Sequence, residues 1–456
     1  MNESQSNSFL AEQPVGALMR KFSLPCILSL LVGALYNIVD QLFIANASYL
    51  GSYGNAANSV VFPLTVIALA IATMIGDGCC AYVSIRLGAG EPEKAHRSVG
   101  NAIVLTLIVS VMLMAVYLIF MDPILTAFGA TVNAETFAHA REYCFWIALG
   151  IPFYMFGQAM NPIIRSDGSP RYAMLSLLAG AVCNIVLDPI LIFGLLGFPR
   201  MEVAGAAVAT IVGQFVGAGL GLFLNLKKNP EVQIHLKNIR PHRATVADIY
   251  AIGIPSIIMQ SIGSVMMFGM NKILISFTEA ATAVFGAYFK LQSFIFMPCF
   301  GLNNAMVPIV SYNYGAQKFD RVRKTVRLTV FTAIGIMCVG CALFELIPET
   351  LLGMFSPTDE MLSIGRVALR IIGVHFPLAG FSIIAGSACQ ALGKPIYALI
   401  NSVCRQIVVL LPAAYLLSLT GRLELVWLAF PIAEVVSVIL NATFLRLTYR
   451  VSLERK

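Results

Sequence analysis

The feature that most constrains this chain is a succession of twelve apolar runs, separated by short clusters of charged residues, glycine and proline. Most of the runs are long enough for an α-helix to cross the hydrocarbon core of a bilayer. Only 12% of the residues are charged, whereas soluble domains carry about 25%. We therefore predict an all-α polytopic membrane protein with twelve transmembrane helices, at about residues 22–45, 56–83, 99–120, 138–163, 171–196, 203–225, 249–277, 283–311, 326–347, 366–390, 396–418 and 424–445.

The basic residues are distributed unevenly among the connections. Lys and Arg precede the first run, follow every second run and end the chain, as in Lys227 and Lys228, whereas the other connections hold mostly acids, such as Asp122 and Glu349, or no charge. By the positive-inside rule, both termini are expected in the cytoplasm and the protein in the inner membrane of the cell. The net charge of +7 then reflects orientation in the membrane, and we expect no nucleic-acid partner.

The two halves of the chain share short sequence elements. Ser84–Gly90, after the second run, matches Ser311–Gln317 after the eighth, and Gly168–Ala173 matches Gly393–Ala398. Since each half has an even number of runs, both enter the membrane from the same side, as in parallel-repeat transporters. We predict two pseudo-symmetric six-helix lobes at residues 1–226 and 248–456, joined by a cytoplasmic linker at 227–247.

The first run carries a carboxylate, Asp40, near its middle. An aspartate at the centre of a membrane helix costs roughly 2.5 to 3.5 kcal/mol, so such residues usually face a cavity, a partner or a transport path. Tyr36 and Asn37 lie four and three residues earlier, on the same face of the predicted helix. We predict that Tyr36, Asn37 and Asp40 form a functional polar face.

The fifth run contains a second acid in the sequence Asn184–Pro189. Asn184 and Asp188 share a helix face, and Pro189 has no N–H, so the carbonyl of Ile185 is free. This oxygen-rich cluster suits a proton or a small hard cation, although Asp188 could instead lie at the outer mouth of its span. If Asp40 and Asp188 lie close together, they can share one proton; that proximity is a hypothesis at this point.

The sequence contains none of the nucleotide-binding or catalytic motifs that we searched for. Gly393 and Lys394 are followed by Pro395 without the upstream glycine of a phosphate-binding loop, and there is no H-E-x-x-H or G-x-S-x-G. We therefore predict that the protein is not an enzyme, uses no cofactor and takes energy from an ion gradient. Arg405 and Glu434 are expected to be interhelical hydrogen-bond partners, with substrate contact as the alternative.

The Tyr36–Asp40 motif, the Asn184–Pro189 motif, the Gly168–Pro170 turn and the duplicated twelve-span plan together resemble the multidrug and toxic compound extrusion (MATE) family of cation-coupled exporters. The resemblance covers essentially the whole chain. It implies two six-helix lobes with alternating access. It also implies antiport of small amphipathic, often cationic compounds against protons or sodium.

The resemblance also implies a set of site residues, in the branch of the family that couples through the N-terminal lobe. By motif position these are Asp40, Asn184, Asp188 and Tyr36, with Tyr143, Asn161 and Thr210 as further members and sodium, if used, at Asp40, Asn184 and Asp188. Coupling through the C-terminal lobe is disfavoured, because the seventh span offers Gln260 and the eighth Lys290 where that branch has acids. Further candidates for coupling or substrate contact are Asp77, Gln158, Gln260, Lys290 and Met267.

One alternative within the same superfamily is a flippase for lipid-linked oligosaccharides, which would need a more cationic cavity than Lys272, Lys290 and Arg405 provide. A receptor would not need the duplicated plan. The expected partners are small amphipathic organic substrates and the lipid bilayer, and we expect a monomer. The natural substrate and the choice between proton and sodium do not follow from the sequence.

Overall fold

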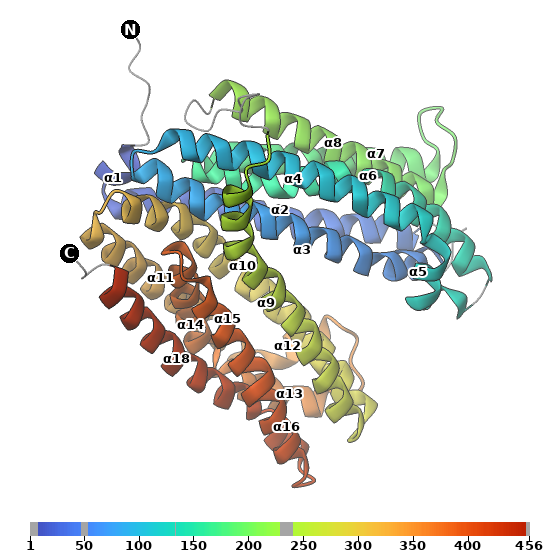
Figure 1. The fold of residues 1–456 in the computed structure, drawn as a ribbon. Helices are drawn as coiled ribbons and strands as arrows, with labels where there is room; N and C mark the ends of the chain where they lie inside the picture. Colours follow the sequence, from blue (N-terminus) through green and yellow to red (C-terminus); the bar gives the residue numbers. More distant parts are fainter. Residues whose placement is uncertain (1–7, 47–52, 133, 229–239, 453–456) are drawn as a thin grey trace. The chain divides into compact units, whose positions relative to one another are not determined.

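The computed structural model describes residues 8–46, 53–132, 134–228 and 240–452, and helices account for most of them (Figure 1). The first half begins with the short helix α1 (Phe9–Glu12), and α5 (Met121–Ala127) and the 3-10 helix η1 (Ala130–Val132) follow the third long helix. The long helices of this half are α2 (Val15–Asn46), α3 (Tyr53–Gly88), α4 (Pro92–Ile119), α6 (Ala134–Ser166), α7 (Pro170–Phe193) and α8 (Glu202–Lys228).

The second half repeats this plan with more interruptions. Its first three long helices are α9 (Arg243–Ile275), α10 (Glu279–Gly315) and α11 (Phe319–Leu346), followed by the short α12 (Pro348–Gly353). The remaining helices are α13 (Asp359–Gly373), α14 (Phe376–Ala391), α15 (Pro395–Val403), the π-helix η3 (Cys404–Leu410), α16 (Leu411–Ser418), α17 (Leu423–Val426) and α18 (Ala429–Ser452).

Within the described residues, eleven helices are long and apolar enough to cross a membrane, and the bent pair α13 and α14 supplies a twelfth span. The predicted all-α protein with twelve spans is therefore confirmed. The tenth span, expected as one helix at 366–390, is two helices that meet at 48°. Pro377, in the first turn of α14, has no N–H to donate to the carbonyl of Gly373, which is where α13 ends.

Contacts between Cα atoms divide the chain into two compact units. The first contains Leu28–Gly253, and the second contains Ile254–Lys456 together with Leu10–Ile27. The division differs from the sequence-based one near the start of the chain. The backbone near α1 is bound within the second unit, because Asn313 Nδ2 and Arg321 Nη2 both donate to Leu10 O, at 3.1 and 3.0 Å. The hydrophobic pattern of Leu10–Ile27 does not indicate whether this segment belongs to the second unit or to the N-terminal lobe.

The internal repeat is visible in the backbone of two pairs of turns. Gly90 and Gln317, at matching positions, both have positive φ, +74° and +57°. Gly168 and Gly393, also at matching positions, have φ of +81° and +76°. Glycine adopts this left-handed region at no steric cost, so three of the four turns use the residue that the backbone requires. The same hydrogen bond closes the first pair, from Glu91 N to Arg86 O and from Lys318 N to Asn313 O, each 2.9 Å.

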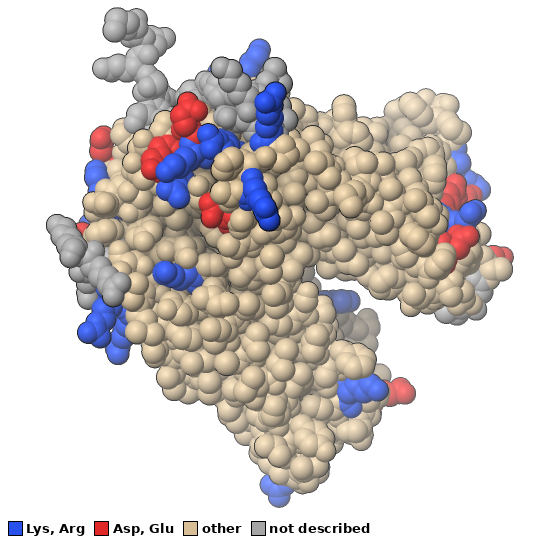
Figure 2. All heavy atoms as spheres, in the orientation of Figure 1, with Lys and Arg blue, Asp and Glu red and all other residues tan. Residues whose placement is uncertain are grey.

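Charged side chains lie mainly near the ends of the helices. On the face drawn in Figure 2, Lys, Arg, Asp and Glu gather toward helix ends, and the broad surfaces between them consist of other residues. At one such end Glu91 accepts hydrogen bonds from Lys94 Nζ at 2.8 Å and Arg86 Nη1 at 2.7 Å, which lower the pKa of its carboxyl group. An apolar belt bounded by charged ends is typical of a protein that crosses a bilayer.

Candidate functional site

The two predicted acids of the first unit lie in one buried polar cluster. Asp40 of α2 is 7% exposed and Asp188 of α7 is fully buried, and the two carboxylates are close enough to interact electrostatically. Tyr143 of α6 is also buried, and Asp40, Asp188 and Tyr36 all lie within electrostatic range of its hydroxyl group. The cluster therefore combines α2 with the consecutive helices α6 and α7, which lie about a hundred residues later in the chain.

Asn184 connects this cluster to α8. Its Nδ2 donates to Asp188 Oδ1 one turn later on α7, at 3.3 Å, and to Thr210 Oγ1 on α8, also at 3.3 Å. Both bonds are long for an N–H···O bond, whose usual range ends near 3.2 Å. Asn184 is 2% exposed, so its amide group has little access to solvent as an alternative partner.

Three oxygens of the cluster are left without a hydrogen bond from any described residue: Asp40 Oδ1, Asn184 Oδ1 and Asp188 Oδ2. Buried polar atoms normally find a partner, so unsatisfied oxygens in one place require an explanation. Carboxylate and amide oxygens are acceptors for a proton donor and ligands for a hard cation. The donor set therefore fits either a proton or a sodium ion.

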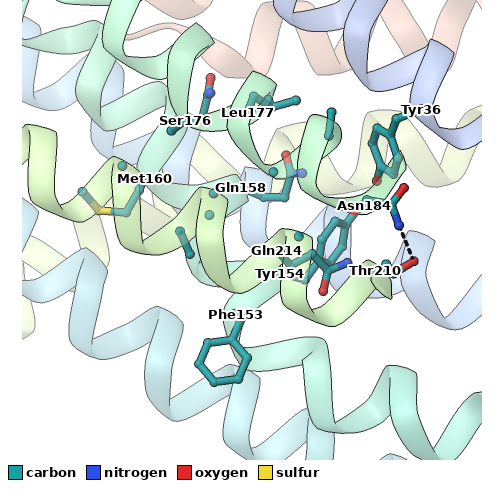
Figure 3. A pocket seen from close by; sticks show the side chains of 18 of the residues that line it. Tyr36, Phe153, Tyr154, Gln158, Met160, Ser176, Leu177, Asn184, Thr210 and Gln214 are labelled. Atoms are coloured by element: carbon teal, nitrogen blue, oxygen red, sulfur yellow. Dashed lines mark hydrogen bonds between the residues drawn. The ribbon is translucent and has the colours of Figure 1, made fainter. Parts of the chain in front are cut away.

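A cavity of about 80 Å³ adjoins the cluster in the first unit (Figure 3). Tyr36, Asn184 and Thr210 lie on its wall, and α6, α7 and α8 supply the rest of the lining. Amide groups come from Gln158 and Gln214. Further lining residues are Phe153, Tyr154, Gly157, Met160, Asn161, Ile164, Ser176, Leu177, Gly180, Ala181, Gly213, Gly217, Ala218 and Gly221.

Glycines on α7 and α8 bring these helices together beside the cavity. A Cβ atom on Gly180 would lie 2.7 Å from Gly213 O, and a Cβ atom on Gly213 would lie 2.7 Å from Gly180 O. Such close backbone approach is possible only without side chains, as at other small-residue interfaces of membrane helices. Gly213, Gly217 and Gly221 recur every four residues on α8, so the helix presents a smooth face to the cavity.

The structure brings together most of the site residues expected in the first unit. Asp40, Asp188, Asn184, Tyr143, Tyr36 and Thr210 share the cluster, and Gln158 and Asn161 line the cavity. Asn161 Nδ2 also donates to Ala173 O at 3.1 Å, which joins α6 to α7. Asn37 is at the edge, exposed, with its Nδ2 donating to Gly33 O at 2.8 Å.

Four other candidates lie outside the cluster and the cavity. Asp77 of α3 is exposed, and its Oδ1 is 4.0 Å from Arg165 Nη2. Gln260, Met267 and Lys290 belong to the second unit, where Lys290 Nζ lies 5.9 Å from the centroid of the Phe355 ring. Gln214, Tyr154 and the glycines of the wall were not expected from the sequence, although the four-residue spacing of glycine on α8 is a readable signal of close helix packing.

Comparison with known proteins adds a family assignment. The family model MatE matches residues 25–190 and again residues 255–416, so it covers both halves of the repeat. The chain belongs to the MATE family. It is therefore a membrane transporter and not an enzyme, as the sequence predicted.

Several members of the MATE family resemble the chain over nearly its whole length. The FAD transporter of Shewanella oneidensis is 26% identical over 93% of each chain, and the multidrug export protein MepA of Staphylococcus aureus is 27% identical over 92% of this chain and 91% of its own. Among solved structures, the MATE multidrug transporter DinF-BH, in complex with rhodamine 6G, has 36% identity and a TM-score of 0.87, with 100% of both chains covered. A MOP superfamily transporter from Pyrococcus furiosus has 25% identity and a TM-score of 0.90 over the same coverage.

Proposed function

We propose that this MATE protein is a secondary antiporter that exports small amphipathic, mainly cationic organic compounds in exchange for protons or sodium. The observation that carries the proposal is the position of Asn184. It lies on the cavity wall and hydrogen-bonds both Asp188, next to Asp40, and Thr210. An ion at the acids and a substrate in the cavity therefore share one side chain. The similarity to MepA and to DinF-BH, which was solved with rhodamine 6G, supports export of drug-like compounds.

The proposed coupling follows from charge. Two carboxylates in one buried site are costly when both are ionised, and a proton or sodium ion reduces that cost. The entering ion occupies carboxylate oxygens that otherwise attract a cationic substrate, and it alters the acceptor available to Asn184 Nδ2. A ligand shifts a conformational equilibrium only by its difference in affinity for the two states, so the ion must bind the outward state more tightly. Reciprocal linkage then makes substrate binding oppose ion binding.

The experiment that tests the function uses purified protein in liposomes with rhodamine 6G as reporter. An imposed proton or sodium gradient is expected to drive the dye across the membrane against its own gradient, and an ionophore that dissipates the effective gradient is expected to stop it. The gradient that drives movement identifies the coupling ion. Dye movement that is equal with and without both gradients would contradict antiport.

The proposed orientation places both termini and the linker at 227–247 in the cytoplasm. Its support is the enrichment of Lys and Arg in the connections that follow every second span. A protease site appended after Lys456 is expected to be cut in inside-out membrane vesicles and protected in right-side-out vesicles. The reverse pattern would contradict the orientation. We retain the monomer as a proposal, and the flippase alternative is not favoured, because the relatives named above are transporters of FAD and of drugs.

A further inference from the structure

The second unit contains a charge pair that the coupling scheme does not use. Arg405 Nη1 donates to Glu434 Oε2 at 3.1 Å and joins η3 to α18, so the expected interhelical bond is present. Arg405 stands near the midpoint of the span Pro395–Ser418. A guanidinium at that depth is expensive in hydrocarbon and marks a water-filled path, a partner or a substrate route.

The pair is poorly matched as a purely structural salt bridge. Glu434 is 2% exposed, and its Oε1 has no hydrogen bond from any described residue. Arg405 keeps 31% of its side chain exposed, and the bond to Glu434 uses one guanidinium nitrogen. Strong arginine–carboxylate pairs use two parallel bonds. A half-satisfied buried pair adds little stability over apolar residues of similar size, which favours a role other than stability.

The backbone at Arg405 is unusual in the same place. η3 is a π-helix over Cys404–Leu410, inside a span that is otherwise α-helical. Such π-segments are rare and are found frequently at functional sites. One turn before Arg405, Asn401 Nδ2 of α15 donates to Ser437 Oγ on α18 at 3.1 Å. Two successive side-chain bonds therefore join the span Pro395–Ser418 to α18.

The internal repeat gives Arg405 a counterpart in the first unit. Ten residues after Pro170 comes Gly180, and ten residues after the matching Pro395 comes Arg405. Gly180 lines the cavity of the first unit, between α7 and α8. Arg405 therefore occupies, in the fifth span of the second repeat, the position that a residue of the cavity wall occupies in the first.

Two buried aromatic side chains complete this part of the second unit. Tyr288 of α10 and His375, at the bend between α13 and α14, both lie within electrostatic range of Arg405 and Glu434. The ring of His375 stacks on Phe430, with centroids 6.2 Å apart. Tyr288, His375 and Phe430 are 1%, 3% and 6% exposed, so they pack behind the charge pair, and the exposed part of Arg405 is the part that an anionic group can reach.

We propose that Arg405 is an anion-receiving residue of the second unit, and that Glu434 is the internal counter-ion that holds it until a phosphate or carboxylate group of a substrate takes its place. The proposal rests on the export function above and adds an anionic substrate class to it. Because Arg405 lies at mid-span, we assign the anion to a transported substrate, since the headgroup of a resident bilayer lipid stays at the membrane surface.

The test compares riboflavin and flavin mononucleotide, which share a ring and side chain and differ in one phosphate group. Binding to the full-length protein is measured by flavin fluorescence for the wild type, Arg405→Gln, Arg405→Lys and Glu434→Gln. We expect Arg405→Gln to weaken binding of the mononucleotide at least tenfold, Arg405→Lys to weaken it less, and Glu434→Gln to tighten it. Riboflavin binding should stay within twofold in all three variants. Arg366→Gln is the matched control, because Arg366 pairs with Glu349 at 2.8 Å with 48% of its side chain exposed, outside the proposed site.

Equal changes in the affinity for both flavins would show a structural role for Arg405 and overturn the proposal. Unchanged affinity for the mononucleotide in Arg405→Gln would overturn it as well. If Arg405→Gln fails to fold, the binding measured for Arg405→Lys and Glu434→Gln decides, since Arg405→Lys keeps the positive charge and Glu434→Gln keeps the size of the side chain. A wild type that transports rhodamine 6G and binds neither flavin would overturn this inference and leave the export function intact. A wild type that does not transport rhodamine 6G would count against the export function itself.

Discussion

Replacement of Asp188 by asparagine is expected to reduce gradient-driven export of rhodamine 6G to the level of empty liposomes, and replacement of Asp40 by asparagine is expected to do the same. Asparagine keeps the size of each side chain but can neither ionise nor accept a proton at neutral pH. At Asp188 the amide oxygen can still accept the bond from Asn184 Nδ2, so the local packing should survive. The measurement is the initial rate of dye movement under the driving gradient, at matched protein content.

The control for this pair is Asp122→Asn, which removes a carboxylate that is 54% exposed and bonded to Arg141 at 2.9 Å. Exposed ion pairs contribute about 0 to 1 kcal/mol, so export should stay near the wild-type rate. Equilibrium binding of rhodamine 6G is expected to weaken in both cluster variants, because one carboxylate that attracts the cation is lost, but to remain measurable, because the cavity wall is unchanged. Wild-type coupled export by either cluster variant would exclude the proposed mechanism, and loss of the protein from the membrane would show a folding role instead.

The fold was largely predictable because membrane insertion leaves a strong signal in the sequence. A run such as Pro92–Ile119 is apolar along most of its length, so its identity as a span does not depend on its neighbours. The bend between α13 and α14 was not predicted, although Pro152 stands at the matching position inside the continuous helix α6. The same placement of proline, as Ile-Pro or Phe-Pro, therefore occurs in one continuous helix and at a break between two helices, and the surrounding packing decides which.

The candidate site was predictable only as a set of residues. Asp40 and Asp188 are conspicuous as acids in apolar runs, but their proximity depends on how α2 and α7 pack, and the sequences of these two helices do not identify their packing partners. Thr210 shows the same limit, because its bond to Asn184 depends on the register between α7 and α8. That register is set by glycines, which have no polar side chain and are therefore not recognised as site residues from the sequence.

Substitution of Gly180 or Gly213 by alanine is expected to destabilise the first unit and to lower rhodamine 6G binding and export together. The new methyl group would lie 2.7 Å from the opposing backbone carbonyl, and a backbone atom cannot move aside as a side chain can. The two helices must separate, which costs about 1 to 3 kcal/mol for overpacking at a tight contact. Separation also moves Asn184 away from Thr210, because these residues lie on the two helices concerned.

The matched control is Gly219→Ala on the same helix, where a Cβ atom would meet no heavy atom within 4 Å. Alanine is favoured over glycine in a helix by about 1 kcal/mol, so this variant should be as stable as the wild type or more so. Glycine-to-alanine substitution is thus expected to lower the stability of the protein at Gly213 and to keep or raise it at Gly219. Thermal unfolding in detergent and affinity for rhodamine 6G measure the two effects. If Gly180→Ala and Gly213→Ala match Gly219→Ala in both measurements, α7 and α8 do not approach as closely as described, and the cavity wall would need another explanation.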